Sequence, residues 1–168
     1  MTLKMKPIAI TQGDPAGIGP EIIVKAFRDA PDVTQGCFVV GDVATLRRAA
    51  QCVVGALPVA VLDGCSEALA VPPHCLPVLP CGALAAVPTL GQVSASAGRS
   101  AAECVVWAAN AALRGEVSAL VTAPLHKEAL ALAGSPHADF PGHTEMLQAL
   151  CAAHTGQTLV DLPVRLRR

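Results

Sequence analysis

The first elements of the fold can be predicted from the run Ile8-Ala9-Ile10-Thr11-Gln12-Gly13-Asp14-Pro15-Ala16-Gly17-Ile18-Gly19-Pro20-Glu21. Its first three residues form a short apolar run with β-branched side chains, which predicts a strand. Pro20 suits the first turn of a helix, and Glu21 favours the positive end of that helix. We therefore expect a strand, a glycine-rich turn and a helix whose apolar face is formed by Ile22, Ile23, Ala26 and Phe27.

The glycine-rich turn allows two interpretations. Gly17 and Gly19 let the backbone pass close to another group, and Asp14 adds a carboxylate. The turn is not a Walker A loop, because no Gly-Lys-Ser/Thr follows, and it lacks the usual GxGxxG dinucleotide fingerprint. Spacing alone favours a tight structural turn over a ligand-binding loop.

Strands and helices continue to alternate along the chain. We expect strands at residues 37–42 and 59–62 with a helix at 43–54 between them. Five prolines between residues 71 and 88 confine that region to short edge strands or loops. We expect a long helix at 94–113, ended by Gly115 and with Trp107 packed on the sheet, and then a central strand at 117–122. This alternation predicts an α/β fold.

Composition limits the classes of protein to which the chain can belong. The 168 residues suffice for one domain with a core, or for part of a larger protein. With 52% hydrophobic and 15% charged residues and a formal net charge of -1, neither a disordered tail nor a charge-driven nucleic-acid binder is indicated. Every apolar run is too short to cross a bilayer. We expect a soluble, cytoplasmic protein with no nucleic-acid or membrane partner.

The seven cysteines are odd in number and include no CxxC pair, so the spacing of a zinc ribbon is absent. Cys37 and Cys104 lie among apolar residues, and we expect both to pack as small hydrophobes. The local sequence around each cysteine gives no indication of a lowered pKa.

Polar residues follow the strand predicted at 117–122. Ligands of open α/β sheets bind beyond the carboxyl ends of the strands, so Thr122, His126 and Lys127 occupy positions typical of site residues. The alternative is a helix start at which His126 and Lys127 are solvated.

A second polar junction is Phe140-Pro141-Gly142-His143-Thr144-Glu145, where a Pro-Gly turn runs into a helix. Thr144 is an acceptable N-cap, and apolar residues follow it at helical spacing. Free N–H groups at a helix start favour an anionic substrate group. Alternatively, Thr144 only caps the helix and His143 lies on the surface. Because the turns near Asp14, Thr122 and His143 each follow a predicted strand end, we expect them to line one cleft.

Together, the runs 12–21, 121–129 and 141–145 resemble the motifs of the 4-hydroxythreonine-4-phosphate dehydrogenase family of pyridoxal phosphate biosynthesis. They occur in the family's order and spacing, and Gly98 in the alanine-rich helix fits as well. The resemblance runs from about Ile8 to about Arg165 and corresponds to the N-terminal half of a family member.

The resemblance implies a three-layer α/β/α fold like that of isocitrate and isopropylmalate dehydrogenases, with two domains, an active site in the interdomain cleft and a homodimer. It implies oxidation of 4-phosphooxy-L-threonine, a phosphorylated hydroxy amino acid, by NAD or NADP with a divalent metal (Zn, Mg or Co). The product, 2-amino-3-oxo-4-(phosphooxy)butanoate, loses carbon dioxide to give 3-amino-2-oxopropyl phosphate.

The resemblance places the family's substrate-binding His-Thr pair on His143 and Thr144. From its charge and position, we expect Lys127 to help neutralise the phosphate or carboxylate of the substrate. Asp14 and the neighbouring glycines are expected to shape the floor of the cleft. The family's three metal-binding histidines lie downstream of the Gly-His-Thr-Glu motif, and we expect no metal ligand among the histidines of this chain.

Residues 159–164 resemble the start of the family's next strand, but Arg165-Leu166-Arg167-Arg168 stands where the family has an apolar continuation. We therefore expect residues 1–168 to be the N-terminal part of a two-domain dehydrogenase, truncated or frameshifted, and inactive and poorly soluble alone. Two alternatives stay open: a non-catalytic remnant that associates with a full-length paralogue, and a paralogue that oxidises another hydroxy acid.

Overall fold

The computed structural model describes residues 5–53 and 55–156. Its centre is a five-stranded sheet in the order β3-β4-β2-β1-β5, in which every pair of neighbours is parallel. The strands are β1 (Ile8–Thr11), β2 (Cys37–Gly41), β3 (Val59–Val61), β4 (Leu76–Pro80) and β5 (Ala119–Thr122). The α/β fold predicted from the alternation of strands and helices is confirmed.

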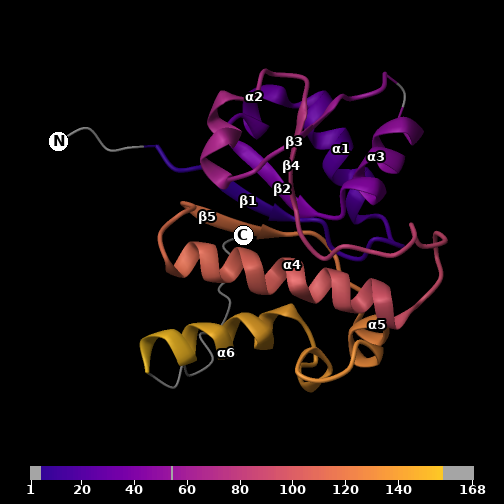
Figure 1. Ribbon diagram of the computed structural model, residues 1–168, viewed down its shortest axis with the longest axis vertical. Helices are drawn as coiled ribbons and strands as arrows, with labels where there is room; N and C mark the ends of the chain where they lie inside the picture. The colour runs from indigo at the N-terminus through magenta and orange to yellow at the C-terminus, as the bar shows by residue number, and fades with distance from the viewer. Residues whose placement is uncertain (1–4, 54, 157–168) are drawn as a thin grey trace, which may run out of the picture.

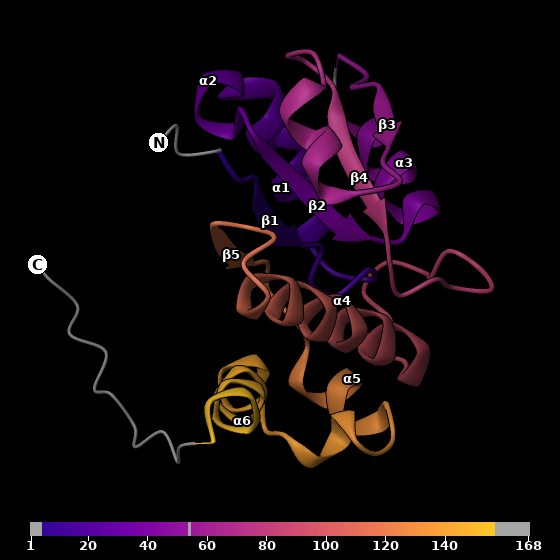
Figure 2. The same cartoon turned by 60° about the vertical axis from the view of Figure 1, so that its left-hand side comes forward.

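Helices cover both faces of this sheet (Figures 1 and 2). On one face, α1 (Gly19–Asp29) packs beside α3 (Val43–Cys52). On the other face lies α4 (Ala95–Leu113), and α5 (Lys127–Leu132) and α6 (His143–Thr155) pack on the side of α4 that is turned away from the sheet. The short helix α2 (Pro31–Thr34) and the 3-10 turns η1 (Cys65–Ala70) and η2 (His137–Asp139) complete the elements of the described residues. These are the three expected layers, with α5 and α6 added outside α4.

Alternate side chains of β2 supply two cores, one on each face of the sheet. Val39 packs with residues of α1 and α3, whereas Phe38 and Val40 pack with residues of α4. Trp107 of α4 meets Phe38 edge-on, with ring centroids 6.2 Å apart and an interplanar angle of 86°. The prediction that Trp107 packs on the sheet is confirmed. Each fully buried side chain of these cores, such as Phe38 or Val39, stabilises the fold by about 1.5–3 kcal/mol.

The apolar face of α1 differs from the predicted one. Ile23 and Phe27 are buried as expected, but Ile22 is 46% exposed and Ala26 also faces solvent, while Val24 is fully buried. Residues 20, 23, 24 and 27 have the i, i+3, i+4, i+7 spacing of one helix face, and this set excludes positions 22 and 26.

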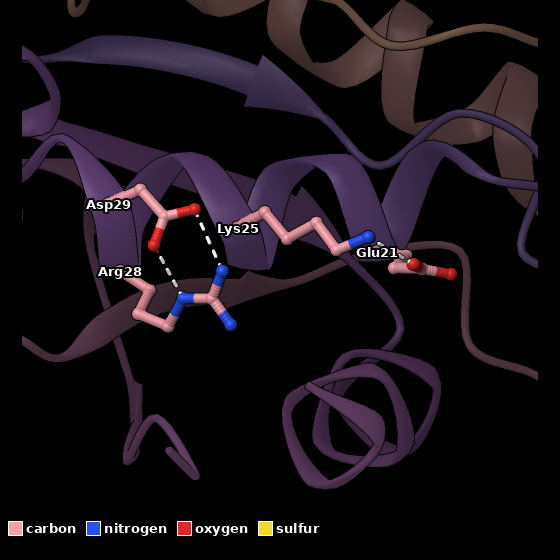
Figure 3. A network of polar contacts seen from close by, with 4 residues as sticks. All are labelled: Glu21, Lys25, Arg28 and Asp29. Atoms are coloured by element: carbon pink, nitrogen blue, oxygen red, sulfur yellow. Dashed lines mark hydrogen bonds and ion pairs between the residues drawn. The ribbon is translucent and has the colours of Figure 1, made fainter. Parts of the chain in front are cut away.

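The solvent-facing side of α1 carries two ion pairs, shown in Figure 3. Lys25 Nζ lies 2.5 Å from Glu21 Oε1, one turn earlier, and Arg28 Nε lies 2.6 Å from Asp29 Oδ1. The hydrogen bond from Arg28 lowers the pKa of Asp29. Exposed pairs of this kind contribute little to stability, so they mark the outer surface rather than a site.

The prediction that the proline-rich region forms only edge strands or loops is wrong, because β4 lies between β3 and β2. The N–H of Leu76 donates toward β3, and the N–H of Cys81 donates toward β2. Successive residues of β4 point their main-chain nitrogens to opposite neighbours. The nitrogen of Pro77 therefore faces β2, but the pairing of β4 with β2 begins only at the next residue. The nitrogen of Pro80 faces β3, but β3 has already ended before this position. Both prolines therefore stand where the ladder needs no donor.

The prediction of a central strand near residue 120 is also wrong for the described residues. There β5 pairs with β1 and stands last in the strand order. Leu120 packs toward α4, whereas Ala119 and Val121 point to the other face and are exposed, Val121 by 50%. An apolar run suggested burial on both faces, but here one face is covered. The strand predicted at 159–164 lies outside the described residues.

Helix α4 begins and ends as expected. The hydroxyl of Ser94 accepts a hydrogen bond from the N–H three residues further on. At the other end, Gly115 adopts a φ of 70°, and the N–H groups of Gly115 and Glu116 donate to the carbonyls of Ala112 and Ala111. This is a Schellman motif, which needs the left-handed conformation that glycine adopts without strain.

No helix in the described part of the chain combines the length and apolar character that a membrane span requires.

Candidate active site

The direction in which the chain winds reverses between β1 and β5. From β1 the chain passes through α1 to β2 on one side of β1, whereas β5 follows α4 and lies on the other side of β1 (Figure 1). In open α/β sheets, ligands bind at such a switch point, beyond the carboxyl ends of the strands. The loops that leave β1 and β5 are therefore the candidate site.

These two loops lie in direct contact. The N–H of Asp14 donates to the carbonyl of Pro124 at 2.9 Å. A Cβ on Gly13, which has a φ of 71°, would lie 2.3 Å from the same carbonyl oxygen, and a Cβ on Gly19 would lie 2.4 Å from the carbonyl oxygen of Gln12. Real side chains do not tolerate such contacts, so glycine at position 13 lets the two loops meet, and glycine at position 19 lets the first loop fold back on its own start.

Asp14 holds the glycine-rich turn from within. It is 7% exposed, its Oδ1 accepts from the N–H of Ala16 at 2.9 Å, and its carbonyl accepts from the N–H of Gly17 at 3.0 Å. Because Asp14 occupies both donors, the turn does not present them to a phosphate. The geometry supports the interpretation of residues 13–19 as a structural turn that shapes the end of the sheet.

A buried amide that the sequence analysis does not single out connects the strand ends. Gln12 is fully buried; its Oε1 accepts from the N–H of Asp42 at 2.9 Å, and its Nε2 donates to Ser100 Oγ at 3.0 Å. Ser100 Oγ in turn donates to the carbonyl of Gly82 at 2.6 Å. This network joins the ends of β1, β2 and β4 to α4. Its partners lie up to 88 positions apart, so no local pattern could reveal it.

The loop after β5 leads directly into α5. Thr122 is the last residue of β5, half-buried and in register with Thr11 of β1. His126 is the N-cap of α5, and its Nδ1 accepts from the N–H of Ala129 at 3.4 Å. Both His126 and Lys127 are exposed. The segment is thus a helix start with exposed His126 and Lys127 side chains, and their role as site residues stays a prediction. The Lys127 side chain lies at the surface beside the next helix start.

Helix α6 begins two residues earlier than predicted. Gly142 is its N-cap and His143 its first residue, so the prediction that Thr144 caps the helix is wrong. Gly142 is extended at φ -176° and makes no side-chain cap. The carboxylate of Glu145 stands close by, because a Cβ on Gly142 would lie 3.3 Å from Glu145 Oε2. Glu145 is the third residue of α6, a position from which a carboxylate can reach back to the start of the helix.

The starts of α5 and α6 lie side by side. The same Cβ on Gly142 would lie 3.8 Å from Lys127 Cε. His143 is half-buried and Thr144 is exposed in the first turn of α6. An ammonium group next to the positive end of a helix attracts a carboxylate or phosphate, and Glu145 is the internal anion with which such a ligand competes.

His143 does not follow a strand end, contrary to the prediction. It follows α5 and η2, and α6 is held on α4 by a small cluster in which Met146 packs with Val105 and Leu130. The turns near Asp14 and Thr122 do stand at neighbouring strand ends, and residues 122–127 connect them to the α5 start. One cleft lined by Asp14, Thr122 and His143 together stays a prediction.

Two surface cavities lie elsewhere. One of ≈ 170 Å³ lies at the amino ends of β2 and β4, lined by residues that include Phe27, Cys37 and Cys75. Another of ≈ 550 Å³ lies beside β4 and α4, lined by residues that include Leu79 and Trp107. Neither is lined by a predicted site residue, so the candidate site is defined by the switch point and the helix starts rather than by these cavities.

Within residues 5–53 and 55–156, no three His, Cys, Asp or Glu side chains stand together in a way that could hold a metal ion. The described residues therefore do not form a metal centre by themselves.

Comparison with known proteins identifies the family. The family model described as "Pyridoxal phosphate biosynthetic protein PdxA" matches residues 34–165. The 4-hydroxythreonine-4-phosphate dehydrogenase of Beijerinckia indica is 40% identical over 175 residues, covering 98% of this chain and 48% of that protein. The D-threonate 4-phosphate dehydrogenase of Salmonella typhimurium is 43% identical over 153 residues, covering 88% of this chain and 45% of that protein.

Solved structures agree with these relatives. The crystal structure of 4-hydroxythreonine-4-phosphate dehydrogenase from Klebsiella pneumoniae matches with a TM-score of 0.77 at 40% identity, over 90% of this chain and 45% of that chain. The corresponding structure from Burkholderia phymatum matches with a TM-score of 0.78 at 36% identity, over 92% of this chain and 44% of that chain. The chain spans about half the length of the curated relatives it matches. On the match to most of its length, this chain belongs to the PdxA family of pyridoxal phosphate biosynthetic proteins.

Proposed function

We propose that this chain supplies part of the substrate site of a dehydrogenase that oxidises a phosphorylated hydroxy acid. The observation that carries the proposal is the meeting of two helix starts, where Lys127 lies against Gly142 and the first turn of α6 presents His143 and Thr144. The names of the relatives support the reaction class.

In the proposed reaction, 4-phosphooxy-L-threonine is oxidised to 2-amino-3-oxo-4-(phosphooxy)butanoate, which decarboxylates to 3-amino-2-oxopropyl phosphate on the way to pyridoxal 5'-phosphate. NAD or NADP, when bound, accepts the hydride. The divalent metal (Zn, Mg or Co) has its ligands outside the described residues. We propose that the whole protein has two domains and works as a cytoplasmic homodimer.

The contribution of this chain is binding and orientation. The imidazole of His143 and the hydroxyl of Thr144 hydrogen-bond polar groups of the substrate, and the Lys127 ammonium neutralises its phosphate or carboxylate. The positive end of α6 adds to this attraction. Asp14, Gly17 and Gly19 keep the neighbouring loop closed and fixed in shape. Holding the substrate in one orientation lowers the barrier to hydride transfer, because less freedom is then lost in the transition state.

A second candidate substrate is D-threonate 4-phosphate. The observation that favours it is the relative of that name from Salmonella typhimurium, which is 43% identical, against 40% for the 4-hydroxythreonine-4-phosphate dehydrogenase of Beijerinckia indica. The two substrates share a phosphate at one end and a carboxylate at the other. The proposed anion site at Lys127 and α6 serves either of them.

The test uses a chimaera in which this chain is followed by the C-terminal half of the Beijerinckia indica relative. NADH formation is followed with each of the two substrates, NAD and a divalent metal, and the 168-residue chain is assayed alongside. We expect turnover by the chimaera and none by the 168-residue chain alone. Turnover of D-threonate 4-phosphate without turnover of the threonine derivative would favour the second candidate, and turnover of neither would contradict the proposal.

A further inference from the structure

Two cysteines meet where β4 ends against α4. Cys81 directly follows β4, and Cys104 lies in the middle of α4. The thiol of Cys104 donates to the carbonyl oxygen of Cys81, with its sulfur 3.7 Å from that oxygen. Cys104 is fully buried in the core between the sheet and α4, and Cys81 packs at the margin of that core, half-buried. One thiol of the pair is therefore reachable from solvent and the other is sheltered behind it.

The two side chains also interact directly. The neighbouring Cys104 thiol, which can alternatively turn its one proton toward the Cys81 sulfur, lowers the pKa of Cys81, and the same interaction together with burial raises the pKa of Cys104. The local sequence gives no indication of this lowered pKa, because its cause is a contact between residues 23 positions apart. Burial raises the pKa of Cys37, so that buried thiol is a poorer nucleophile than Cys81.

A disulfide forms readily only where the two sulfurs can meet without a large movement of the backbone. The Cys104 sulfur already lies 3.7 Å from the main-chain oxygen of Cys81, so we expect side-chain rotation to bring the two sulfurs together. A half-buried thiol with a lowered pKa beside a second thiol is the arrangement of a peroxide-sensitive pair.

We propose that Cys81 and Cys104 are a peroxide-sensitive pair in which Cys81 is oxidised and Cys104 then closes an intramolecular disulfide. In the first step the Cys81 thiolate attacks hydrogen peroxide, the O–O bond breaks, and Cys81 sulfenic acid and hydroxide form. In the second step the Cys104 sulfur attacks the Cys81 sulfur, the S–O bond breaks, and the Cys104 proton leaves with the hydroxyl group as water. Peroxide is reduced and the two thiols are oxidised, so atoms and electrons balance.

A disulfide between Cys81 and Cys104 would strengthen the attachment of β4 to α4. Cys81 is followed by Gly82, whose carbonyl accepts from Ser100 in the buried network of Gln12. A covalent bond between residues 81 and 104 would tie β4 to α4 next to that network. We expect the oxidised chain to unfold at a higher temperature than the reduced chain, because the bond restricts the unfolded state.

The test treats the 168-residue chain with a small excess of hydrogen peroxide and measures intact mass and peptide masses. We expect a mass lower by two hydrogen atoms and a cross-link between the tryptic peptides 49–99 and 100–114, assigned to Cys81 rather than Cys75 by fragmentation. The control variant Cys75→Ser should still cross-link, and Cys81→Ser should not. A cross-link at Cys75, or oxidation of Cys52 before any cross-link appears, would overturn the proposal.

A second measurement separates the two steps. In Cys104→Ser, the sulfenic acid on Cys81 has no partner, so dimedone should label Cys81 several-fold more than in the parent chain. Equal labelling of Cys81 in the two proteins would show that Cys104 does not attack the sulfenic acid, and would also overturn the proposal. The parent chain's own cross-link decides the matter if Cys104→Ser does not fold.

Discussion

At the scale of single residues, Gln12 determines how the strand ends are held together. It is fully buried, it uses both ends of its amide, and its side chain fills the space that a Cβ on Gly41 would need. Truncating it leaves the Asp42 N–H without its acceptor and opens a cavity. Both the lost hydrogen bond and the cavity lower the free energy of unfolding.

We therefore predict that Gln12→Ala lowers the free energy of unfolding by about 2–4 kcal/mol, from a lost buried hydrogen-bond partner and the cavity left behind. Urea denaturation followed by circular dichroism measures the change. Gln51→Ala, at an exposed position of α3, is the matched control and should change stability by less than about 0.5 kcal/mol. Equal stabilities of the two variants would mean that the Gln12 network does not hold the strand ends.

His143 is the residue whose role depends most on the proposed function. In the chimaera with the relative's C-terminal half, His143→Ala should weaken substrate binding about 10- to 100-fold, the effect of losing a hydrogen bond to a charged group. Isothermal titration calorimetry with the substrate measures it. His154→Ala, at an exposed position near the end of α6, is the control and should bind normally. Unchanged binding by His143→Ala would remove this residue from the site.

At the scale of elements, the contact between α4 and α5 depends on one glycine. A Cβ on Gly98 would lie 1.9 Å from the carbonyl oxygen of Ala129 and 2.8 Å from the nitrogen of Leu130, both main-chain atoms. The absence of a side chain lets the two helices touch through their backbones. This contact fixes the start of α5, and with it Lys127.

Gly98→Ala should therefore destabilise the chain by about 3 kcal/mol, the upper part of the usual range for overpacking, because main-chain atoms cannot move aside cheaply. Thermal unfolding tests this. Gly64→Ala is the matched control, because nothing lies within 4 Å of the Cβ that it adds, and it should shift stability by no more than about 0.5 kcal/mol. A neutral Gly98→Ala would show that α5 packs less closely on α4 than described.

The elements also show what the sequence can and cannot predict. Periodicity located β1, β2, β3, α1, α3 and α4, because each buries a stripe or a run that is local in sequence. Periodicity did not predict the interior position of β4. A proline is tolerated inside a sheet only where its nitrogen faces a position that needs no hydrogen-bond donor, and the strand order decides where those positions are. Periodicity misplaced Ile22 for a related reason: two stripes of α1 are apolar, and only packing selects one of them.

The features of the candidate site likewise separate into those that are local in sequence and those that join distant segments. Lys127, His143 and the glycine-rich turn could be proposed as site elements from the sequence because each lies within a short continuous motif. The contacts from Gln12 to Ser100 and from Cys81 to Cys104 join segments 88 and 23 positions apart, and they exist only once the sheet and α4 have packed. The N-cap of α6 was placed wrongly because Thr144 and Gly142 are both acceptable caps, and the local backbone decides between them.

At the scale of the whole molecule, the described residues differ in how firmly they are held. All five residues of β2 are buried between two cores, whereas Met146 is the one buried residue of α6. Helix α6 is attached to α4 through a cluster with four buried members. Local opening costs least where few apolar contacts are lost.

Hydrogen exchange should therefore separate the two regions. We predict that the amides of α6 exchange at least about tenfold faster than those of β2 under native conditions, because α6 can open without disturbing the sheet. Mass spectrometry of peptides from each region measures this. Similar protection of α6 and β2 would indicate that α6 opens only when the whole chain unfolds.

In the proposed function, the start of α6, with Lys127 beside it, binds the anionic end of the substrate of a PdxA-family dehydrogenase. The most direct measurement is NADH formation by the chimaera and by its Lys127→Met variant, as a function of 4-phosphooxy-L-threonine concentration. We predict turnover by the parent and a KM raised about 10-fold or more in Lys127→Met, because a methyl thioether cannot neutralise the phosphate or carboxylate. An unchanged KM in an active Lys127→Met variant would contradict this placement of the substrate.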